Sequence, residues 1–310
     1  MQKTNIIALI VITLILASVL PSNAATSRLI ASFPTLGGDS IAVDSNGYIY
    51  VLDSNFVQKY DNSGNYITRW GNTGDEQLYG ASGIAIDKQN NIYIADSYNF
   101  CVKKYSQAGS LLLKFGSYGV GNGQFKGLRD VVVDNNGNIY TTDLTGYRVQ
   151  KFDSNGNFIL KWGSSGTLNG QFTGLNGIAV DKSNNIYTTD SSVSNIQKFS
   201  SNGVFLEKWD DLGLFAVRFR NPMGISVDSN GYVYCANTTW DNVVMLTSKG
   251  DLFLKVADDW ELNIPTDVAV DKRGIVYAID YTGNVFKYAI DGVSSSPSLI
   301  PSMLNILLTQ

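Results

Sequence analysis

The sequence of 310 residues contains no histidine. Catalytic triads that need an imidazole base, and zinc sites with imidazole ligands, are therefore excluded. Basic residues are also few: 23 Lys and Arg stand against 27 Asp and Glu, a formal net charge of −4 at pH 7. A surface that binds nucleic acid is usually basic because it must neutralise phosphates. We therefore expect no nucleic-acid partner.

Long apolar stretches are scarce, and the longest lies at the N-terminus. Lys3 precedes an apolar run over residues 6–20, and the small residues Ser22 and Ala24 follow it. This order is typical of a secretory signal peptide over residues 1–24. The alternative is an uncleaved membrane anchor, but the run is shorter than the roughly 20 residues that a spanning helix needs. We expect the mature protein to be secreted or extracytoplasmic. We also expect it to be a monomer without a membrane-spanning segment.

One motif recurs six times along the chain, as GIAVDKSNNIYTTD at residues 177–190 illustrates. Its two acidic positions are nine residues apart. The first is Asp44, Asp87, Asp134, Asp181, Asp228 and Asp271, and the second is Asp53, Asp96, Asp143, Asp190, Asn237 and Asp280. Apolar residues alternate within each copy, which indicates β-strands. Because each ladder member recurs once per copy, we assign both ladders to structure rather than to catalysis.

Four strands every 43 to 47 residues are typical of a β-propeller blade. We predict an all-β, six-bladed β-propeller of four-stranded antiparallel blades over residues 25–292. The sixth copy lacks a fourth strand, and residues 28–33 are expected to supply it and close the ring. Residues 293–310 form a Ser/Pro-rich and apolar tail. Cys101 and Cys235 fall on opposite blades, too far apart for a disulfide, so both thiols should be free and mostly buried.

The repeat resembles the NHL-repeat family of six-bladed propellers. The resemblance rests on the GIAVD-xxx-NIY-xx-D opening, the Val-Gln-Lys-Phe third strand and the Phe-x-x-x-Trp-Gly closing strand, and it covers about residues 28–292. The chain departs from the family's Asn-His signature, where Phe100, Tyr147 and Ser194 stand instead. Relatives by fold include amidating lyases, streptogramin lyases and lactonases. The resemblance implies active sites built on histidine in these relatives, and this chain has no histidine to place there.

Binding residues are expected on the face of the disc that carries the second-to-third turns and the interblade loops. These segments are irregular and aromatic, unlike the short repetitive turns of the other face. The candidate partner-binding residues are Tyr98, Phe100, Arg129, Tyr147, Asn176, Trp240 and Tyr281. The alternative for each aromatic ring is that it only fills a gap between blades.

A second group of polar residues is expected at the mouth of the central channel on that face. The first strands begin there, which places Asp39, Asp130 and Asp267 around one opening together with Arg129 and Asn176. Such carboxylates can hold Ca²⁺ or orient a polar ligand. The alternative is a water-filled channel with charged lips.

Two functions follow from these features. The favoured one is an exported, non-enzymatic scaffold without a cofactor, which binds a protein, peptide or glycan on the loop-rich face. The alternative is a Ca²⁺-dependent lyase or hydrolase whose carboxylate site lies at the channel mouth. Without histidine, we expect the scaffold rather than the enzyme.

Overall fold

The computed structural model describes residues 25–71, 74, 77–210, 219–257 and 261–293. The predicted signal peptide and residues 294–310 of the predicted tail lie outside these ranges, so export of the chain stays a prediction. In the described ranges, no helix has the length and apolar character needed to cross a membrane.

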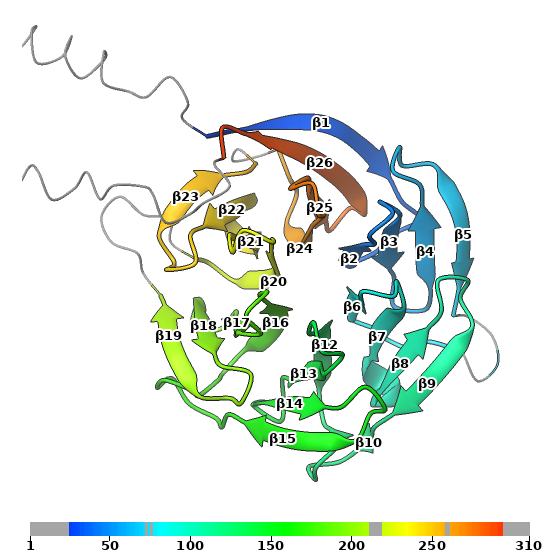
Figure 1. The fold of residues 1–310 in the computed structure, drawn as a ribbon, viewed down its shortest axis with the longest axis vertical. Helices are drawn as coiled ribbons and strands as arrows, with labels where there is room; N and C mark the ends of the chain where they lie inside the picture. Colours follow the sequence, from blue (N-terminus) through cyan, green and yellow to red (C-terminus); the bar gives the residue numbers. More distant parts are fainter. Residues whose placement is uncertain (1–24, 72–73, 75–76, 211–218, 258–260, 294–310) are drawn as a thin grey trace, which may run out of the picture.

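Six four-stranded antiparallel sheets stand around a central axis, as predicted (Figure 1). The first three blades are β2 (Ser40–Val43), β3 (Ile49–Leu52), β4 (Val57–Tyr60) and β5 (Tyr66–Trp70); β6 (Gly83–Ile86), β7 (Ile92–Asp96), β8 (Cys101–Tyr105) and β9 (Leu111–Phe115); and β12 (Leu128–Val133), β13 (Ile139–Asp143), β14 (Arg148–Phe152) and β15 (Phe158–Trp162).

The fourth and fifth blades are β16 (Leu175–Val180), β17 (Ile186–Asp190), β18 (Asn195–Phe199) and β19 (Phe205–Trp209); and β20 (Pro222–Val227), β21 (Val233–Asn237), β22 (Asn242–Leu246) and β23 (Leu252–Lys255). The sixth consists of β24 (Pro265–Val270), β25 (Val276–Asp280), β26 (Asn284–Asp291) and β1 (Thr26–Pro34). The short elements are β10 (Ser117–Tyr118), β11 (Gln124–Phe125), η2 (Ser97–Asn99) and η3 (Thr238–Trp240).

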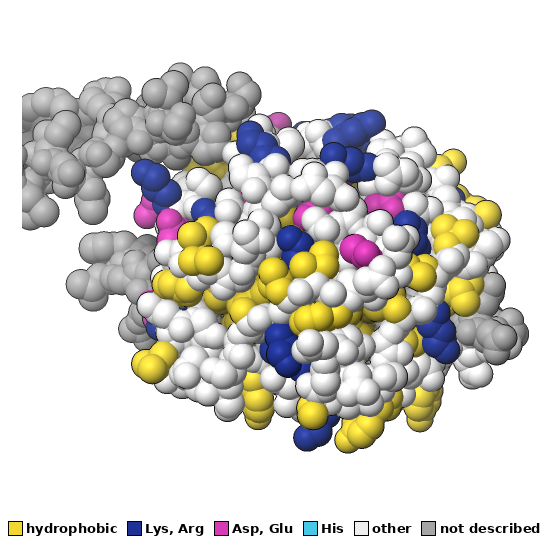
Figure 2. All heavy atoms as spheres, turned by 60° about the horizontal axis from the view of Figure 1, so that its bottom comes forward, with side chains coloured by type: hydrophobic (Ala, Val, Ile, Leu, Met, Phe, Trp, Pro, Cys, Tyr) yellow, Lys and Arg dark blue, Asp and Glu magenta, His cyan; other side chains and the backbone are white. Residues whose placement is uncertain are grey.

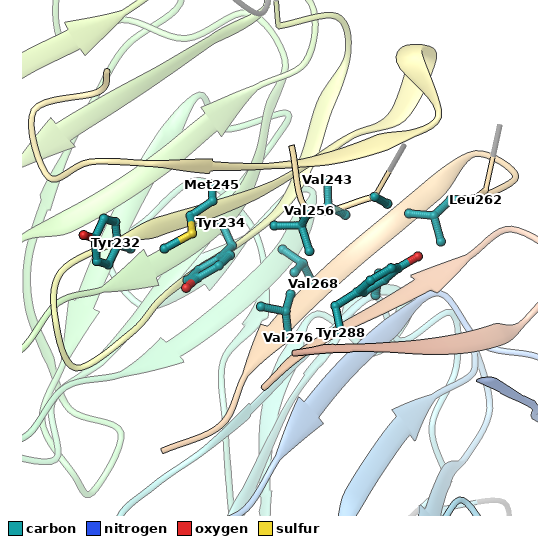
Figure 3. Close-up of a cluster of buried hydrophobic side chains, with 11 residues drawn as sticks. Tyr232, Tyr234, Val243, Met245, Val256, Leu262, Val268, Val276 and Tyr288 are labelled. Carbon is teal, nitrogen blue, oxygen red and sulfur yellow. The ribbon is translucent and has the colours of Figure 1, made fainter. Parts of the chain in front are cut away.

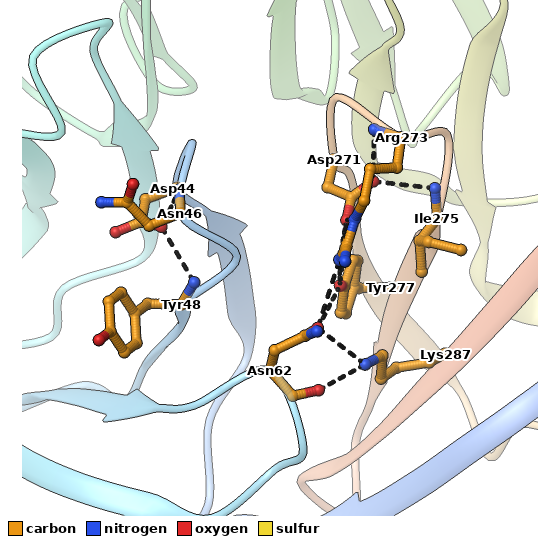
Figure 4. A network of polar contacts seen from close by, with 9 residues as sticks. All are labelled: Asp44, Asn46, Tyr48, Asn62, Asp271, Arg273, Ile275, Tyr277 and Lys287. Atoms are coloured by element: carbon orange, nitrogen blue, oxygen red, sulfur yellow. Dashed lines mark hydrogen bonds and ion pairs between the residues drawn. The ribbon is translucent and has the colours of Figure 1, made fainter.

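The N-terminal strand closes the ring, as the incomplete sixth repeat predicts. β1 pairs antiparallel with β26, from Thr26 opposite Asp291 to Pro34 opposite Asn284. Polar contacts join blades 6 and 1 beside it (Figure 4): Lys287 donates to the carbonyl oxygen of Asn62 at 2.6 Å. The N-terminal strand therefore completes blade 6, and side-chain contacts join this blade to blade 1.

The first acidic ladder has the expected structural role. In blade 3, Asp134 accepts the backbone N–H groups of Asn136 and Asn138 at 2.8 and 2.9 Å, and the hydroxyl of Tyr140 at 3.1 Å. A carboxylate with several such donors holds the turn between the first two strands. The equivalent aspartates in the other blades accept the corresponding bonds.

Apolar side chains fill the space between neighbouring blades. The cluster between blades 5 and 6 includes Tyr234 and Met245 from one blade and Val268 and Tyr288 from the other (Figure 3). Cys101 and Cys235 are fully buried and free, as predicted.

The outer strands of the blades alternate between half-buried and exposed side chains. Leu112, Ile159 and Leu206 are exposed members of this pattern. Figure 2 shows the result on one part of the rim, where apolar side chains lie among polar and basic ones. The outer strands thus expose one face to solvent and pack the other face against the core.

Candidate functional site at the channel mouth

A cavity of about 860 Å³ opens over the central channel, on the face that carries the interblade loops. Its volume suits a small organic molecule. Eight of the ten residues predicted for binding or metal ligation line it: Asp39, Tyr98, Phe100, Arg129, Asp130, Asn176, Asp267 and Tyr281. The narrower channel beneath, of about 220 Å³, is lined by the apolar inner strands. Asp130 and Asp267 line both spaces and therefore mark the floor of the cavity.

These two aspartates occupy equivalent positions in opposite blades. Asp130 accepts the N–H of Val131 at 2.8 Å and, from the next blade, the N–H of Ile178 at 2.9 Å. Each carboxylate thereby bonds one inner strand to the next, which holds it at the channel entrance.

Asp267 repeats this arrangement between blades 6 and 1. It accepts the N–H of Val268 at 2.8 Å, the N–H of Ile41 at 2.9 Å and the hydroxyl of Ser40 at 2.6 Å. The same position in blades 2, 4 and 5 is glycine. A Cβ on Gly83 would overlap the carboxylate of Asp130, and one on Gly224 would overlap that of Asp267. Glycine in the preceding blade thus makes room for each aspartate.

Both carboxyl groups hold their protons more tightly than an ordinary aspartate. Burial raises the pKa of Asp267 to about 6. Burial also raises the pKa of Asp130 well above its usual range, and the negative charge of Asp267 raises it further. Two like charges facing one space resist simultaneous ionisation, so the pair favours a state that carries one proton.

Arg129 supplies positive charge beside the pair. Its Nε donates to Oδ1 of Asn176 at 2.8 Å, which joins blades 3 and 4 and orients the guanidinium. The charge of Arg129 opposes the rise in the pKa of Asp130, Asp267 and Asp39. The cavity therefore combines the carboxyl groups of Asp39, Asp130 and Asp267 with the cationic side chains of Arg129 and Lys126.

The donor set does not fit the Ca²⁺ site expected from Asp39, Asp130 and Asp267. Ca²⁺ takes six to eight oxygen ligands, whereas the described residues contain no group of three acidic, histidine or cysteine side chains placed to hold a metal. Both oxygens of Asp130 and of Asp267 also accept N–H groups, and Oδ1 of Asn176 accepts Arg129. The three aspartates share a cavity without forming a metal-binding cluster.

The predicted aromatic residues divide into two sets. Tyr98 and Tyr281 are 63% and 70% exposed and line the cavity, and Phe100 lines it while also contacting the core between blades 2 and 3. Tyr147 and Trp240 do not line it. Tyr147 packs on the core between blades 3 and 4, and the guanidinium of Arg220 lies over the ring of Trp240.

Tyr79 is 57% exposed and also lines the cavity, although it is not among the residues predicted for binding. Its ring lies 5.2 Å from that of Tyr98 in an edge-to-face arrangement. Tyr79 follows directly after a buried interblade residue, Leu78, that recurs as Phe or Leu in other blades. The residues that directly follow this interblade position are Tyr79, Lys126, Thr173, Arg220 and Asn263. Tyr79 is the one aromatic residue among these five, and this signal is visible in the sequence.

The fold and a sequence match together define the class of protein. The NHL repeat matches residues 78–105, and the structure has the six four-stranded blades predicted from the repeat. The chain is a six-bladed β-propeller that contains a match to the NHL repeat. Within this class, residues 121–269 match the SMP-30/gluconolactonase/LRE-like region. Among curated proteins, none has a sequence that matches this chain.

Solved structures of similar fold include two kinds of enzyme. Virginiamycin B lyase from Staphylococcus aureus has a TM-score of 0.60 at 9% identity, over 85% of this chain and 99% of the lyase. A gluconolactonase from Xanthomonas campestris has a TM-score of 0.62 at 14% identity, over 88% of this chain and 99% of that protein. At these identities the likeness establishes the fold alone.

The comparisons contradict the expected non-enzymatic scaffold. The matched region is that of a gluconolactonase-like family, and these structural neighbours are a lyase and a lactonase. The prediction failed because it took the absence of histidine as an argument against catalysis, although carboxyl groups with raised pKa values can also transfer protons. The lyase or hydrolase reading is better supported.

Proposed function

We propose that the protein is a hydrolase that opens an ester or lactone in the channel-mouth cavity. The observation that carries this proposal is the pair of carboxyl groups, Asp130 and Asp267, on the floor of the cavity, whose pKa values burial raises above those of ordinary aspartates. Titratable groups perturbed in this way and gathered in a cavity are typical of enzyme active sites. The match to the gluconolactonase-like region supports the choice of substrate class.

The two carboxyl groups take complementary roles. Asp267, with a pKa of about 6, is mostly ionised at pH 7 and accepts a proton from a water molecule. The resulting hydroxide attacks the carbonyl carbon, and Arg129 stabilises the oxyanion that forms. As the carbon–oxygen bond breaks, Asp130 gives its proton to the leaving alkoxide. The products are an acid and an alcohol, joined in one molecule when the substrate is a lactone, and proton exchange with solvent restores the pair.

A lyase is the second candidate, because virginiamycin B lyase and a streptogramin B lyase share the fold. In that reaction the same base would remove a proton from carbon, and the leaving group would depart with formation of a C=C bond. The neighbour lyase has a catalytically inactive histidine-to-alanine variant. This chain has no histidine, so hydrolysis by the carboxyl pair is the better-supported reaction.

The test is acid release from a panel of lactones and esters, measured by pH-stat with the purified protein. We expect hydrolysis at neutral pH, and a loss of about 100-fold or more in kcat for Asp267→Asn and Asp130→Asn. Trp240→Ala is the matched control, since this exposed loop residue lies outside the cavity, and it should retain activity. Reaction in H₂¹⁸O should place the isotope in the acid product.

Three results would overturn the proposal. They are no turnover of any ester or lactone, full activity in Asp267→Asn, or a product with a new C=C bond and no isotope. A chelator should leave the rate unchanged, because the carboxylates are not gathered as metal ligands. Loss of activity on chelation, with recovery on adding Ca²⁺, would contradict the proton-transfer roles.

A further inference from the structure

Blade 2 departs from the other blades at two exposed positions. Tyr98 lies at the tip of the second-to-third turn, where the other blades carry small polar residues: Asn55, Thr145, Ser192, Thr239 and Thr282. Tyr79 lies in the preceding interblade loop, where the counterparts are also polar. Both tyrosines are more than half exposed. Because the other blades fold without these rings, blade packing does not account for them, and an exposed aromatic pair at a cavity indicates binding.

The blade holds this aromatic pair in place. The N–H of Tyr79 donates to Asp96 Oδ1 at 2.8 Å, and the N–H of Tyr98 donates to the carbonyl oxygen of Tyr79 at 3.0 Å. Asp96 is fully buried and forms an ion pair of 2.9 Å with the equally buried Lys103. Gly80, which directly follows Tyr79, has a φ of +58°, and a Cβ at this position would overlap the ring of Tyr98. A ligand therefore finds an ordered surface and pays little entropy for ordering it.

Tyr98 of the aromatic pair lies on an element that contacts the strand of Arg129. Strand β12, which carries Arg129, contacts η2, which carries Tyr98. The hydroxyl of Ser82 donates to the carbonyl oxygen of Arg129 at 2.5 Å and shares a hydrogen bond with Ser97, next to Tyr98. The positions equivalent to Arg129 hold Asp39, Ser82, Asn176, Met223 and Thr266. Arg129 and the aromatic pair thus line one cavity, with the backbone of Arg129 beside blade 2 and its guanidinium hydrogen-bonded on the side of blade 4.

We propose that the substrate is an ester or lactone with an aromatic ring in its acyl part. The ring lies against Tyr79 and Tyr98, and the carbonyl oxygen binds the guanidinium of Arg129. This assignment rests on the proposed hydrolase function and adds the substrate class to it. An edge-to-face tyrosine pair accepts a further aromatic ring, since aromatic rings attract one another in offset and edge-to-face geometries.

Binding of a product-like probe tests the assignment without turnover. Phenylacetate carries the ring and an oxygen pair for Arg129; cyclohexylacetate has an apolar ring without aromatic character, and glucuronate has a sugar ring with the same charge. By titration calorimetry we expect phenylacetate to bind at least fivefold more tightly than either comparator. Tyr98→Ala should weaken it about fivefold to tenfold and Tyr98→Phe should restore it, while Arg129→Met should abolish binding.

Trp240→Ala is again the control and should bind phenylacetate like the parent protein. Equal or tighter binding of cyclohexylacetate would overturn the aromatic assignment in favour of a general apolar surface. Preference for glucuronate would overturn it in favour of a sugar, and unchanged binding to Tyr98→Ala would place the ring elsewhere. Hydrolysis of alkyl lactones by a protein that does not bind phenylacetate would refute this inference and leave the hydrolase proposal standing. Binding without hydrolysis of any ester would refute the hydrolase proposal instead.

Discussion

Replacing Asp267 by Asn should change how both activity and stability depend on pH. The pKa of Asp267 is raised by burial from an ordinary 3.8 to about 6, so about one in ten of these groups is ionised at pH 5. If its carboxylate is the base, the parent enzyme should lose about tenfold in kcat/KM between pH 7 and pH 5. The Asp267→Asn variant should have a far lower kcat/KM, and this value should not fall tenfold between pH 7 and pH 5.

The same shift has a consequence for folding. The folded protein binds this proton more tightly than the unfolded chain, so the added stability is present below about pH 4 and is lost as the pH rises through about 6. At 1.36 kcal/mol per tenfold change in proton affinity, the parent should lose up to about 3 kcal/mol in its free energy of unfolding over that range. Other carboxyl groups titrate there too, so the comparison with the variant isolates this contribution.

Urea unfolding at pH 4, 5, 6 and 7 measures this slope. Asp267→Asn should be less stable than the parent at pH 4, because an amide cannot accept every bond donated by Ser40, Ile41 and Val268. The parent's curve should fall more steeply with pH than the variant's. Two results would refute this reasoning. One is that the free energies of unfolding of parent and variant change in parallel from pH 4 to pH 7, and the other is that the activity of the variant still falls with a midpoint near pH 6.

Three further predictions concern the scaffold. Gly224→Ala should lower the urea midpoint and kcat together, because the added Cβ overlaps the Asp267 carboxylate; a normal midpoint with normal kcat would contradict the packing described. Lys103→Met should cost about 3–5 kcal/mol in urea unfolding, because it leaves buried Asp96 without its ion pair; a cost below about 1 kcal/mol would be inconsistent with that pair. The Cys101 thiol, whose pKa burial raises to about 11, and Cys235 should react with a thiol reagent only after denaturation; rapid labelling of the native protein at pH 8 would count against their burial.

Much of the fold follows from the repeat alone. The recurring aspartates mark the same turn in each blade, and the alternation of apolar residues defines strands whose faces must be covered by a neighbour. Counting back from the aspartates also located Asp130 and Asp267 at the channel. Their bonds to Ile178 and Ile41 could not be predicted in the same way, because they join different blades and depend on how the ring closes.

The candidate site was predictable only in part. Tyr98 and Tyr281 line the cavity as expected of loop aromatics, whereas Tyr147 and Trp240 occupy similar turns but lie outside it. The sequence does not reveal which way such a side chain points: Phe100 and Tyr147 hold equivalent positions with nearly the same φ, 53° and 51°, yet of these two only Phe100 lines the cavity. The lysines of the third strands do not all pair with the aspartate ladders. Lys104 forms an ion pair with Asp87 and Lys103 forms one with Asp96, while Lys59, Lys151, Lys198 and Lys287 lie over tyrosine rings.

The closure of the ring by β1 also determines how the domain responds to mechanical force. Thr26 and Asp291 face each other at one end of the β1–β26 pair, so a pull that separates these two residues loads the hydrogen bonds one after another. This is an unzipping geometry, in which strands part at lower force than when all their bonds are sheared at once. Tension between these two points should peel β1 from blade 6 first, and the ring would open at this seam while the other five blades remain intact.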